Sequence, residues 1–494
     1  MSQAAGIRDR GLRRLALRTV LGAFPGPTPP DWALSLVADG LAGYTLFGFN
    51  VDTPEGLGSL TAALRTARAD VLVAIDEEAG DVTRLAHRTG SPYPGNAALG
   101  AADDVALTRT IHAAVGAELS AVGVNLNLAP GVDVNTADEN PIIGTRSFGA
   151  DPLLVARHGA AAVAGLQSAG VAACAKHFPG HGATLADSHL ELPTVDCTLD
   201  VLRRRDLPPF VAAIEAGTKA IMTAHIRVPA LTGAQPATLS AAALTGLLRT
   251  ELGFGGVIVS DALEMRGASA ALGIPGAAVA ALNAGTDLLC LGAAVDEPLV
   301  EAVAAAIVKA IVDGRLALAR VTDAAARIDA LARWVSTADR AAPVDAAEAS
   351  LTVARRAITV DGVLPVSAAL VVHVASGHSI AEGLVPWGLS PFLDAIGLDG
   401  VESHSLDAST VDVDRLLARA GTRTLVLVGR HLHRNPAIRA LVEALTAAHP
   451  TVIVEMGWPS PWRPAGAVAF VHTYGATRAN ARAATDLLFR HPVP

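Results

Sequence analysis

Short runs of valine, isoleucine, leucine and alanine recur along the first two thirds of the chain, and a polar or glycine-containing segment follows each run. Longer segments with helical periodicity, such as DPLLVARHGAAAVAGLQSAG, lie between them. Strands that alternate with helices at this spacing predict parallel strands joined by right-handed crossovers. The predicted strands cover residues 43–50, 71–78, 123–130, 171–180, 220–226, 256–263 and 285–292.

The predicted fold class is α/β. Seven strands, with an eighth hidden near the amino terminus, favour a (β/α)8 TIM-type barrel over an open doubly wound sheet, and we assign residues 1–335 to it. The polar, Ala- and Pro-containing stretch 336–350 is interpreted as a linker. Residues 351–494 then repeat the alternation on a smaller scale, which predicts an α/β sandwich domain. Its predicted strands are 368–376, 422–430, 451–456 and 467–475.

Composition narrows the class of protein. The 494 residues are 51% hydrophobic, yet we find no uninterrupted apolar run of about 18 residues, so no membrane span is predicted. The amino-terminal segment lacks the features of a secretory signal or lipid anchor, which predicts a cytoplasmic protein. A net charge of −9 without basic clusters argues against nucleic acid as a partner. Three cysteines without CxxC spacing predict reduced thiols.

Polar side chains follow the predicted barrel strands closely. Barrel enzymes build their active sites at the carboxyl ends of the strands, so this distribution predicts an active site there. The side chains are Asp76, Asn127, Lys176, His177, His225 and Asp261.

The stretch KHFPGHGATLADSH, residues 176–189, is the densest cluster of such groups. His177 and His181 have the spacing of a helical zinc pair, but the proline and glycine between them do not suit a helical turn, so we predict no metal site. Lys176 and His177 could instead offer donors to sugar hydroxyls. A capped loop with satisfied histidines is the structural alternative, and the stretch alone does not decide between the two.

Two further groups have both a chemical and a structural interpretation. Asp187 can accept from one ring nitrogen of His189 and leave the other to exchange a proton with a substrate, although such triplets also occur in ordinary polar loops. Asp261 can act as a carboxylate nucleophile toward an anomeric carbon. Alternatively, Asp261 and Glu264 form an aspartate version of the capping box that starts a helix.

Five ordered motifs resemble the β-N-acetylglucosaminidase (β-N-acetylhexosaminidase) branch of glycoside hydrolase family 3. They are IDEEAGDVTRL (75–85), ENPIIGTRSFG (139–149), KHFPGHGATLADSH (176–189), MTAHI (222–226) and VSDALEM (259–265). The resemblance covers most of residues 35–335, and the sandwich resembles the second domain of many members. It implies an exo-acting glycosidase without a cofactor that releases GlcNAc from muropeptide or chitin-type oligosaccharides, with a role in peptidoglycan recycling.

The resemblance also implies roles for individual residues. Asp261 is the nucleophile of a retaining mechanism with a covalent glycosyl-enzyme intermediate, and His189, paired with Asp187, is the mobile acid/base. The sugar in the terminal subsite is held by Asp76, Arg84, Arg146, Lys176, His177 and His225. One departure from the family pattern is Ala79, which adds a methyl group where paired glycines are common.

The sequence leaves open which acceptor, water or phosphate, receives the sugar and whether that sugar is GlcNAc or glucose. Most retaining glycosidases use a second carboxylate as acid/base. Because a neutral imidazole repels an incoming anion less than a carboxylate does, phosphate remains an alternative acceptor to water. The alternatives are therefore a β-N-acetylglucosaminide phosphorylase, a β-glucosidase of the same family and, outside the enzymes, a carbohydrate-binding protein.

Overall fold

The structure is a computed structural model that describes residues 2–188, 190–338, 344–364, 368–375, 377–396, 401–406 and 411–489. The chain separates into two compact units. The barrel unit consists of Met1–Glu78, Thr108–Pro141 and Ala150–Val344. The sandwich unit consists of Ala79–Leu107, Ile142–Gly149 and Asp345–Pro494.

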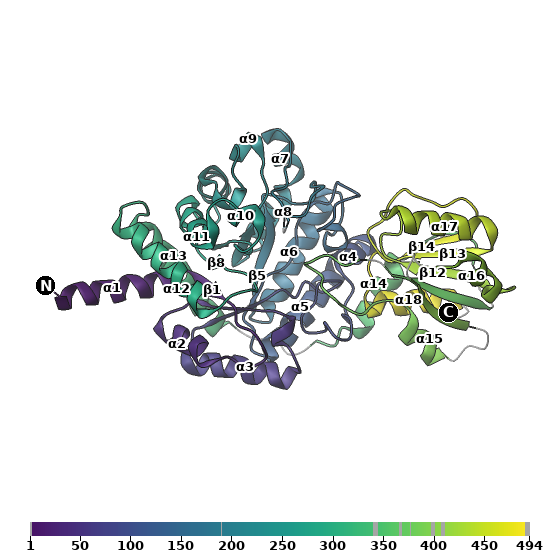
Figure 1. Ribbon diagram of the computed structural model, residues 1–494, viewed down its shortest axis with the longest axis horizontal. Coiled ribbons are helices and arrows are strands. Elements are labelled where there is room, and N and C mark those ends of the chain that lie inside the picture. The colour runs from purple at the N-terminus through teal and green to yellow at the C-terminus, as the bar shows by residue number, and fades with distance from the viewer. Residues whose placement is uncertain are drawn as a thin grey trace. The chain divides into compact units, whose positions relative to one another are not determined.

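The described residues of the barrel unit contain eight parallel strands (Figure 1). They are β1 (Val20–Gly22), β2 (Gly43–Leu46), β3 (Leu72–Ile75), β4 (Leu126–Asn127), β5 (Ala172–Phe178), β6 (Ala220–Thr223), β7 (Val257–Val259) and β8 (Leu289–Cys290). Strands β1 to β7 pair in chain order and β8 pairs with β1. A parallel bridge between Val259 and Leu288 joins β7 to the start of β8. The predicted barrel is confirmed, and its hidden strand is the three-residue β1.

Helices surround these strands, and several begin at a clear sequence signal. Thr53, Asp151 and Asp296 each accept a hydrogen bond from a backbone N–H of the first helical turn, and a proline follows each within that turn. The helices are α1 (Ser2–Leu17), α2 (Asp31–Asp39), α3 (Pro54–Ala67), α5 (Val105–Ala121), α6 (Pro152–Ser168), α7 (Leu199–Arg205), α8 (Pro208–Glu215), α9 (Pro229–Thr232), the π-helix η4 (Ala242–Glu251), α10 (Arg266–Ser269), α11 (Gly273–Ala284), α12 (Glu297–Val312) and α13 (Leu318–Thr337).

Alternate strand residues fill the barrel interior. Ala172 and Cys174 of β5 and Val257 and Val259 of β7 belong to one buried cluster, as expected for side chains that point inward at every second position. Helix α13 packs against this cluster with Ile328, Leu331, Ala332 and Val335. Lys219, directly before β6, lies 4.9 Å from the ring of Trp334 on α13, so this helix covers the amino-terminal end of the barrel.

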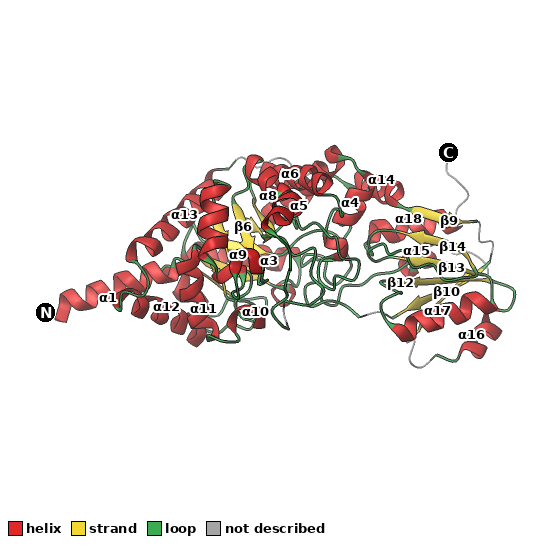
Figure 2. Cartoon of the chain, turned by 90° about the horizontal axis from the view of Figure 1, so that it is seen from above, coloured by secondary structure: helices red, strands yellow, loops and turns green. Residues whose placement is uncertain are grey.

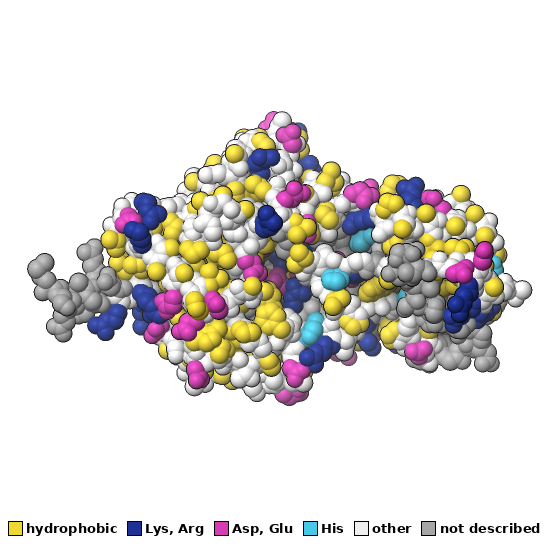
Figure 3. Space-filling view, viewed as in Figure 1, with side chains coloured by type: hydrophobic (Ala, Val, Ile, Leu, Met, Phe, Trp, Pro, Cys, Tyr) yellow, Lys and Arg dark blue, Asp and Glu magenta, His cyan; other side chains and the backbone are white. Residues whose placement is uncertain are grey.

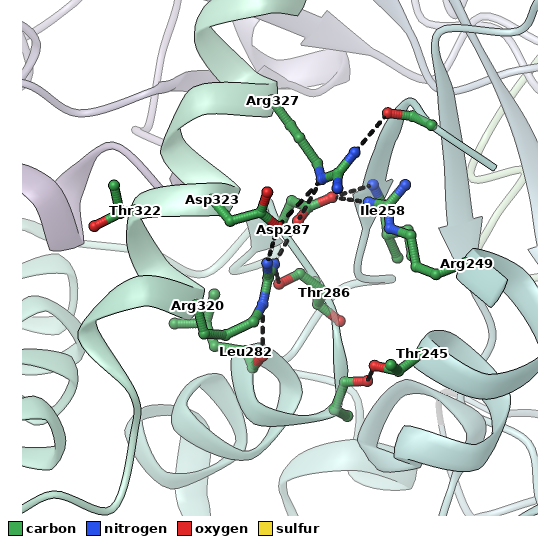
Figure 4. A network of polar contacts seen from close by, with 12 residues as sticks. Thr245, Arg249, Ile258, Leu282, Thr286, Asp287, Arg320, Thr322, Asp323 and Arg327 are labelled. Carbon is green, nitrogen blue, oxygen red and sulfur yellow. Dashed lines mark hydrogen bonds and ion pairs between the residues drawn. The ribbon is translucent and has the colours of Figure 1, made fainter. Parts of the chain in front are cut away.

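A buried ionic network joins β7 to β8 at the same end (Figure 4). The Asp287 carboxylate accepts hydrogen bonds from the Ile258 backbone N–H (2.9 Å) and from the guanidinium groups of Arg249 and Arg320. Arg327 Nε lies 4.0 Å from it. Burial raises the pKa of the Asp287 carboxyl, and the positive charges of Arg249 and Arg320 oppose that rise. The carboxylate is therefore surrounded by donors from the fold itself.

The sandwich unit contains a six-stranded sheet in its described residues, in the order β11-β10-β12-β13-β14-β9. The strands are β9 (Thr359–Gly362), β10 (Ala369–Val374), β11 (Val401–Leu406), β12 (Thr424–Gly429), β13 (Thr451–Glu455) and β14 (Ala467–His472). Only the pair between β14 and the edge strand β9 is antiparallel. The predicted α/β sandwich is confirmed, although β9 and β11 were not predicted.

Helices cover both faces of this sheet (Figure 2). Val426 and Val428 of β12 pack in the cluster of α15 and α18, whereas Leu425 and Leu427 pack in the cluster of α16 and α17. This alternation explains why the β12 sequence is continuously apolar. The helices of the unit are α4 (Asn96–Ala102), α14 (Ala347–Ala357), α15 (Ser390–Ile396), α16 (Val413–Ala420), α17 (Pro436–Ala448) and α18 (Arg478–Phe489), with the 3-10 helix η2 (Gly144–Arg146).

The domain boundaries drawn from the sequence stay a prediction. Helix α13 ends within the predicted linker and α14 begins in it, and residues 339–343 between them lie outside the described part of the chain. Two segments that we assigned to the barrel, Ala79–Leu107 and Ile142–Gly149, group with the sandwich unit. These segments contain two of the predicted sugar-binding residues, Arg84 and Arg146.

The surface shows how the charged residues are distributed. On the face drawn in Figure 3, positively and negatively charged side chains are interspersed rather than gathered by sign. A mixed pattern of this kind is typical of a solvated surface. In the described chain, no helix combines the length and the apolar character that crossing a bilayer requires.

Candidate active site

Three charged residues continue the inward-facing rows of the barrel. Asp76, Lys176 and Asp261 each lie two residues beyond a buried core residue of β3, β5 or β7. Because strand side chains alternate, these groups extend toward the barrel axis above the apolar core. The layer that closes the core at the carboxyl ends of the strands is therefore ionic.

Lys176 links two of the acidic groups. Its Nζ lies 2.6 Å from Asp76 Oδ1 and 2.6 Å from Glu78 Oε1. The Lys176 and Glu78 side chains are each 2% exposed, whereas that of Asp76 is 21% exposed. A compact ammonium group suits this bridging position. Glu78 was missed in the sequence, although it stands in the same acidic run as Asp76; of the three groups, Asp76 is the one with surface left for a ligand.

Asn127 holds this acidic segment in place. Its Oδ1 accepts from the Glu77 backbone N–H (3.0 Å), and its Nδ2 donates to the Glu77 carbonyl oxygen (2.8 Å). Asn127 is fully buried, which is consistent with a positioning role. The turn that follows contains Ala79 at φ 63°, a left-handed conformation that costs a non-glycine residue about 1–2 kcal/mol.

A buried aspartate orients His177. Asp133 Oδ2 lies 2.7 Å from His177 Nδ1, and Asp133 Oδ1 accepts from the backbone N–H groups of His177 (3.2 Å) and His181 (2.6 Å). Burial would raise the pKa of Asp133, but the charge of His177 and its hydrogen bond, together with His181, lower it. An ionised Asp133 fixes the proton of His177 on Nδ1. Asp133 was missed, although it follows the third predicted strand.

Both ring nitrogens of His181 form hydrogen bonds within the loop that contains this residue. Thr184 Oγ1 donates to the His181 carbonyl oxygen (3.0 Å), so the ring Nδ1, 2.7 Å from that hydroxyl, carries a proton and donates to it. The ring Nε2 then accepts from Ser188 Oγ at 3.0 Å. Burial and, to a smaller extent, the nearby His177 lower the pKa of His181 to about 4. The neutral ring therefore ties the Gly-His-Gly turn to the residue that follows Asp187.

Of the predicted acid/base pair, the structure describes Asp187. Asp187 is half-buried, and its carbonyl oxygen accepts from the backbone N–H groups of Leu190 (3.0 Å) and Glu191 (3.1 Å). His189 lies outside the described residues. Within the described parts of the chain, no group of three or more His, Cys, Asp or Glu side chains could hold a metal ion.

Asp261 is half-buried in an irregular segment, where its Oδ1 accepts from the Ala262 backbone N–H (2.8 Å). The interpretation of Asp261 and Glu264 as a capping box is wrong, because no helix starts here and α10 begins only at Arg266. The Glu264 carboxylate turns away and accepts from the Ala293 and Ala294 backbone N–H groups, 2.7 and 3.0 Å away. Asp261 thus has no capping function at this position.

The pKa values of two buried thiols, Cys174 and Cys290, depend on the charged residues at the carboxyl ends of the strands. Burial raises the pKa of Cys290 to about 12, with further contributions from Asp261 and Asp76. Burial also raises the pKa of Cys174, where Lys176 opposes the rise and Asp76 and Asp261 add to it. Asp76 and Asp261, which follow β3 and β7, therefore act on both thiols, and Lys176 of β5 acts on Cys174. Cys174, Cys197 and Cys290 form no disulfide in the structure.

His225 lies one position after the inward row of β6. It is fully buried, with Nε2 3.0 Å from the Ala262 carbonyl oxygen and Nδ1 2.8 Å from Thr238 Oγ1. Because a carbonyl oxygen can only accept, Nε2 carries a proton and donates to it. This donor holds the backbone of the residue next to Asp261, which makes His225 a positioning residue in this geometry.

Arg84 and Arg146 lie in the sandwich unit. Arg84 Nη2 donates to the Ala381 carbonyl oxygen (2.9 Å) and Nη1 to the Glu382 carbonyl oxygen (3.5 Å). Arg146 is 7% exposed, and its Nη1 donates to the Ile142 carbonyl oxygen (3.0 Å). Both guanidinium groups are held by backbone oxygen atoms of the unit.

The chain belongs to glycosyl hydrolase family 3, whose N terminal domain matches residues 31–331. Beta-hexosaminidase A of Pseudoalteromonas piscicida is 38% identical over 289 residues, which are 54% of this chain and 48% of that protein. The chain therefore spans about half the length of that relative. Beta-hexosaminidase of Stenotrophomonas maltophilia (strain K279a) is 39% identical over 277 residues, 54% of this chain and 81% of that protein.

A solved structure extends the similarity beyond the barrel. The family 3 beta-N-acetylglucosaminidase from Paenibacillus sp. str. FPU-7 is 32% identical, with a TM-score of 0.89, and the match covers 98% of both chains. The similar region therefore includes the sandwich as well as the barrel.

Proposed function

We propose that the protein is a retaining exo-β-N-acetylglucosaminidase that removes terminal β-linked GlcNAc from muropeptide or chitin-type oligosaccharides. Membership of glycosyl hydrolase family 3 and the beta-hexosaminidase activity named for its relatives support this proposal. The observation that carries it is the position of Asp261. It is a half-buried carboxylate that shares the carboxyl end of the barrel with the Asp76–Lys176 pair and acts on the same buried thiols.

The proposed reaction has two steps. The Asp261 carboxylate attacks the anomeric carbon, the bond to the leaving oxygen breaks, and His189 gives that oxygen a proton. His189 then removes a proton from water, whose oxygen attacks the anomeric carbon and releases GlcNAc and the free Asp261 carboxylate. Asp187 would hold the His189 ring in the correct tautomer. Two displacements at one carbon retain the β configuration.

The neighbouring groups suit a sugar ligand. Asp76 can accept from sugar hydroxyls through its exposed surface, while Lys176 Nζ pairs with its Oδ1. His177, oriented by Asp133, adds a polar group of fixed direction. The sugar contacts of Arg84 and Arg146 stay predictions. His225 is better suited to holding the segment of Asp261 than to contacting sugar, since both of its ring nitrogens have protein partners.

The test is product analysis with 4-nitrophenyl β-N-acetylglucosaminide and the matching glucoside, each with and without phosphate. We expect β-GlcNAc as the first product, at a rate that does not depend on phosphate. GlcNAc 1-phosphate would instead assign a phosphorylase, and a preference for the glucoside would assign a β-glucosidase. An α-configured first product would overturn the retaining mechanism, and turnover of neither substrate would favour a binding protein.

A further inference from the structure

The sandwich unit contains a small polar cluster around one of the predicted sugar-binding arginines. The turn at residues 379–383 presents the carbonyl oxygen atoms of Ala381 and Glu382 to the Arg84 guanidinium, 2.9 and 3.5 Å away. Arg84 is only half-buried, so these bonds restrict a long side chain that would otherwise sample several rotamers. The direction of the guanidinium therefore depends on the position of this turn.

The side chains of Ser379 and Glu382 hold this turn in its conformation. The Gly383 backbone N–H donates to the Ser379 carbonyl oxygen (3.0 Å), and the Glu382 backbone N–H donates to Ser379 Oγ (3.2 Å). The Glu382 carboxylate bends back to accept from the Ser379 backbone N–H (3.4 Å). Its side chain is 12% exposed, so a charged group closes the turn from the inside.

Arg430, directly after β12, holds that carboxylate. Its Nη2 lies 3.2 Å from Glu382 Oε2 and donates to the Gly377 carbonyl oxygen (3.4 Å), while its guanidinium stacks 5.3 Å from the ring of Trp387. Burial raises the pKa of Glu382, and the charge of Arg430 opposes this rise. Removing one partner from such a buried pair leaves the other charge buried without compensation. The turn that contains Glu382 is therefore expected to keep its position as long as both partners are present.

The Glu382 carboxylate also interacts electrostatically with the second predicted sugar-binding arginine. Asp81 raises the pKa of Glu382, whereas Arg146 lowers it. Asp81 in turn accepts from Thr145 Oγ1 (2.7 Å), next to Arg146, and from the Ala476 backbone N–H (3.1 Å). Glu382 therefore lies within the electrostatic range of both loops that follow β3 and β4.

We propose that Glu382, anchored by Arg430, is a positioning residue that fixes the Arg84 guanidinium for sugar binding, so that the sandwich domain contributes to substrate affinity. The proposal rests on the proposed function, because it takes Arg84 as a sugar contact. Glu382 acts through the backbone oxygen atoms of its turn. In this proposal the sandwich domain acts on substrate binding by ordering one arginine side chain.

The experiment compares the wild type, Glu382→Gln, Arg84→Met and the double variant, with kcat and KM measured separately on 4-nitrophenyl β-N-acetylglucosaminide. We expect Glu382→Gln to raise KM about tenfold with kcat within about threefold of the wild type, because a lost contact that serves ground state and transition state alike appears in KM. In the Arg84→Met background, Glu382→Gln should add less than about twofold, because the group it positions is gone.

Two further variants keep the test decisive. Glu443→Gln removes the carboxylate of the exposed Arg439–Glu443 pair of the same domain, at 3.0 Å, and should leave KM unchanged. Arg430→Lys keeps the charge beside Glu382 and should restore much of the affinity that Arg430→Met loses, which also covers the case that Glu382→Gln does not fold. An unchanged KM in Glu382→Gln, or an equal rise in both backgrounds, overturns the inference. Inactivity of the wild type on every glycoside overturns the proposed function instead.

Discussion

Buried charges occur at both ends of the barrel, but they are compensated differently. At the amino-terminal end, the fully buried Asp287 carboxylate receives donors from two arginines and a backbone N–H. At the carboxyl end, Lys176 and Glu78 are equally buried, yet their partner Asp76 keeps 21% of its side chain exposed, and Asp261 is half-buried. Removing one member of a buried ionic network whose partners all come from the fold destabilises the fold, because the remaining charges lose their partner. Charges with exposed oxygen atoms remain able to bind a ligand.

The comparison predicts that the carboxyl end governs activity. Asp261→Asn should lower kcat by about 10⁴-fold or more, because the amide cannot act as the nucleophile. The unfolding midpoint should stay close to that of the wild type, since residue 261 is only half-buried and an asparagine side chain can still accept from the Ala262 backbone N–H. Steady-state kinetics and thermal unfolding measure the two effects. A variant that keeps more than a tenth of wild-type kcat contradicts the assignment of Asp261.

The amino-terminal end should govern stability. Asp287→Ala leaves Arg249 and Arg320 without their shared carboxylate and should lower the free energy of unfolding by about 3–5 kcal/mol. Denaturant titration measures this loss, and kcat of the folded fraction should not change. Asp323→Ala is the matched control, because Asp323 pairs with Arg320 and Arg327 but is 50% exposed, and it should cost at most about 1 kcal/mol. Equal losses in both variants would remove the distinction.

The carboxyl end should also respond to pH. The folded-state pKa of His181 is about 4, below its ordinary value of 6.5, so the folded protein excludes a proton that the unfolded chain binds. Its contribution is present above pH 6.5 and is lost as the pH falls toward 4, by up to about 3 kcal/mol. In His181→Gln, the decrease in unfolding free energy over this range should be smaller by that amount. An identical pH profile of wild type and variant would contradict the neutral, buried ring.

Asp206, whose folded pKa is raised by burial to about 6, provides a control of opposite sign. Its protonated form is favoured in the folded state, so its contribution to stability decreases as the pH rises from about 4 to 6. Asp206→Asn should therefore steepen the loss of stability on acidification over this range. A shallower profile would show that the sign is wrong.

A smaller effect separates two roles of His225. His225→Phe removes the donor to the Ala262 carbonyl oxygen and should lower kcat about ten- to hundredfold, because the segment that carries Asp261 shifts. The stability cost of the lost bond should be about 1–3 kcal/mol. An increase in KM at constant kcat would instead support the sugar contact that the sequence predicted. Unchanged kinetics would show that His225 is an ordinary core residue.

Much of the fold was predictable because it rests on local patterns. The barrel strands that bear Asp76, Lys176 and Asp261 were visible as apolar runs that end in polar residues. The three-residue β1 and the exposed four-residue edge strand β9 were not, since such short or exposed segments give too few alternating apolar positions. The edge strand β11 was not predicted either. The candidate site residues at the strand ends, such as Asp76, Lys176 and Asp261, could be predicted from the same pattern.

The remaining site residues depend on partners far away in the sequence. Glu78 and Asp133 matter because Lys176 and His177 of β5 reach them from a distant part of the sequence, and no local signal marks such a contact. His225 and His181 were visible as histidines in suggestive motifs. Only their burial and their partners show that the rings hold backbone and loop atoms in place.

By itself, the sequence determined the order of strands and helices, the barrel and sandwich classes, and the residues at the strand ends, because side-chain alternation and helical periodicity are local properties of the chain. The tertiary structure decided which of the charged residues are neutralised within the fold and which keep exposed oxygen atoms. It also grouped the segment of Arg84 with the sandwich unit. Burial and long-range pairing set these outcomes, and both depend on which distant segments the folded chain brings into contact.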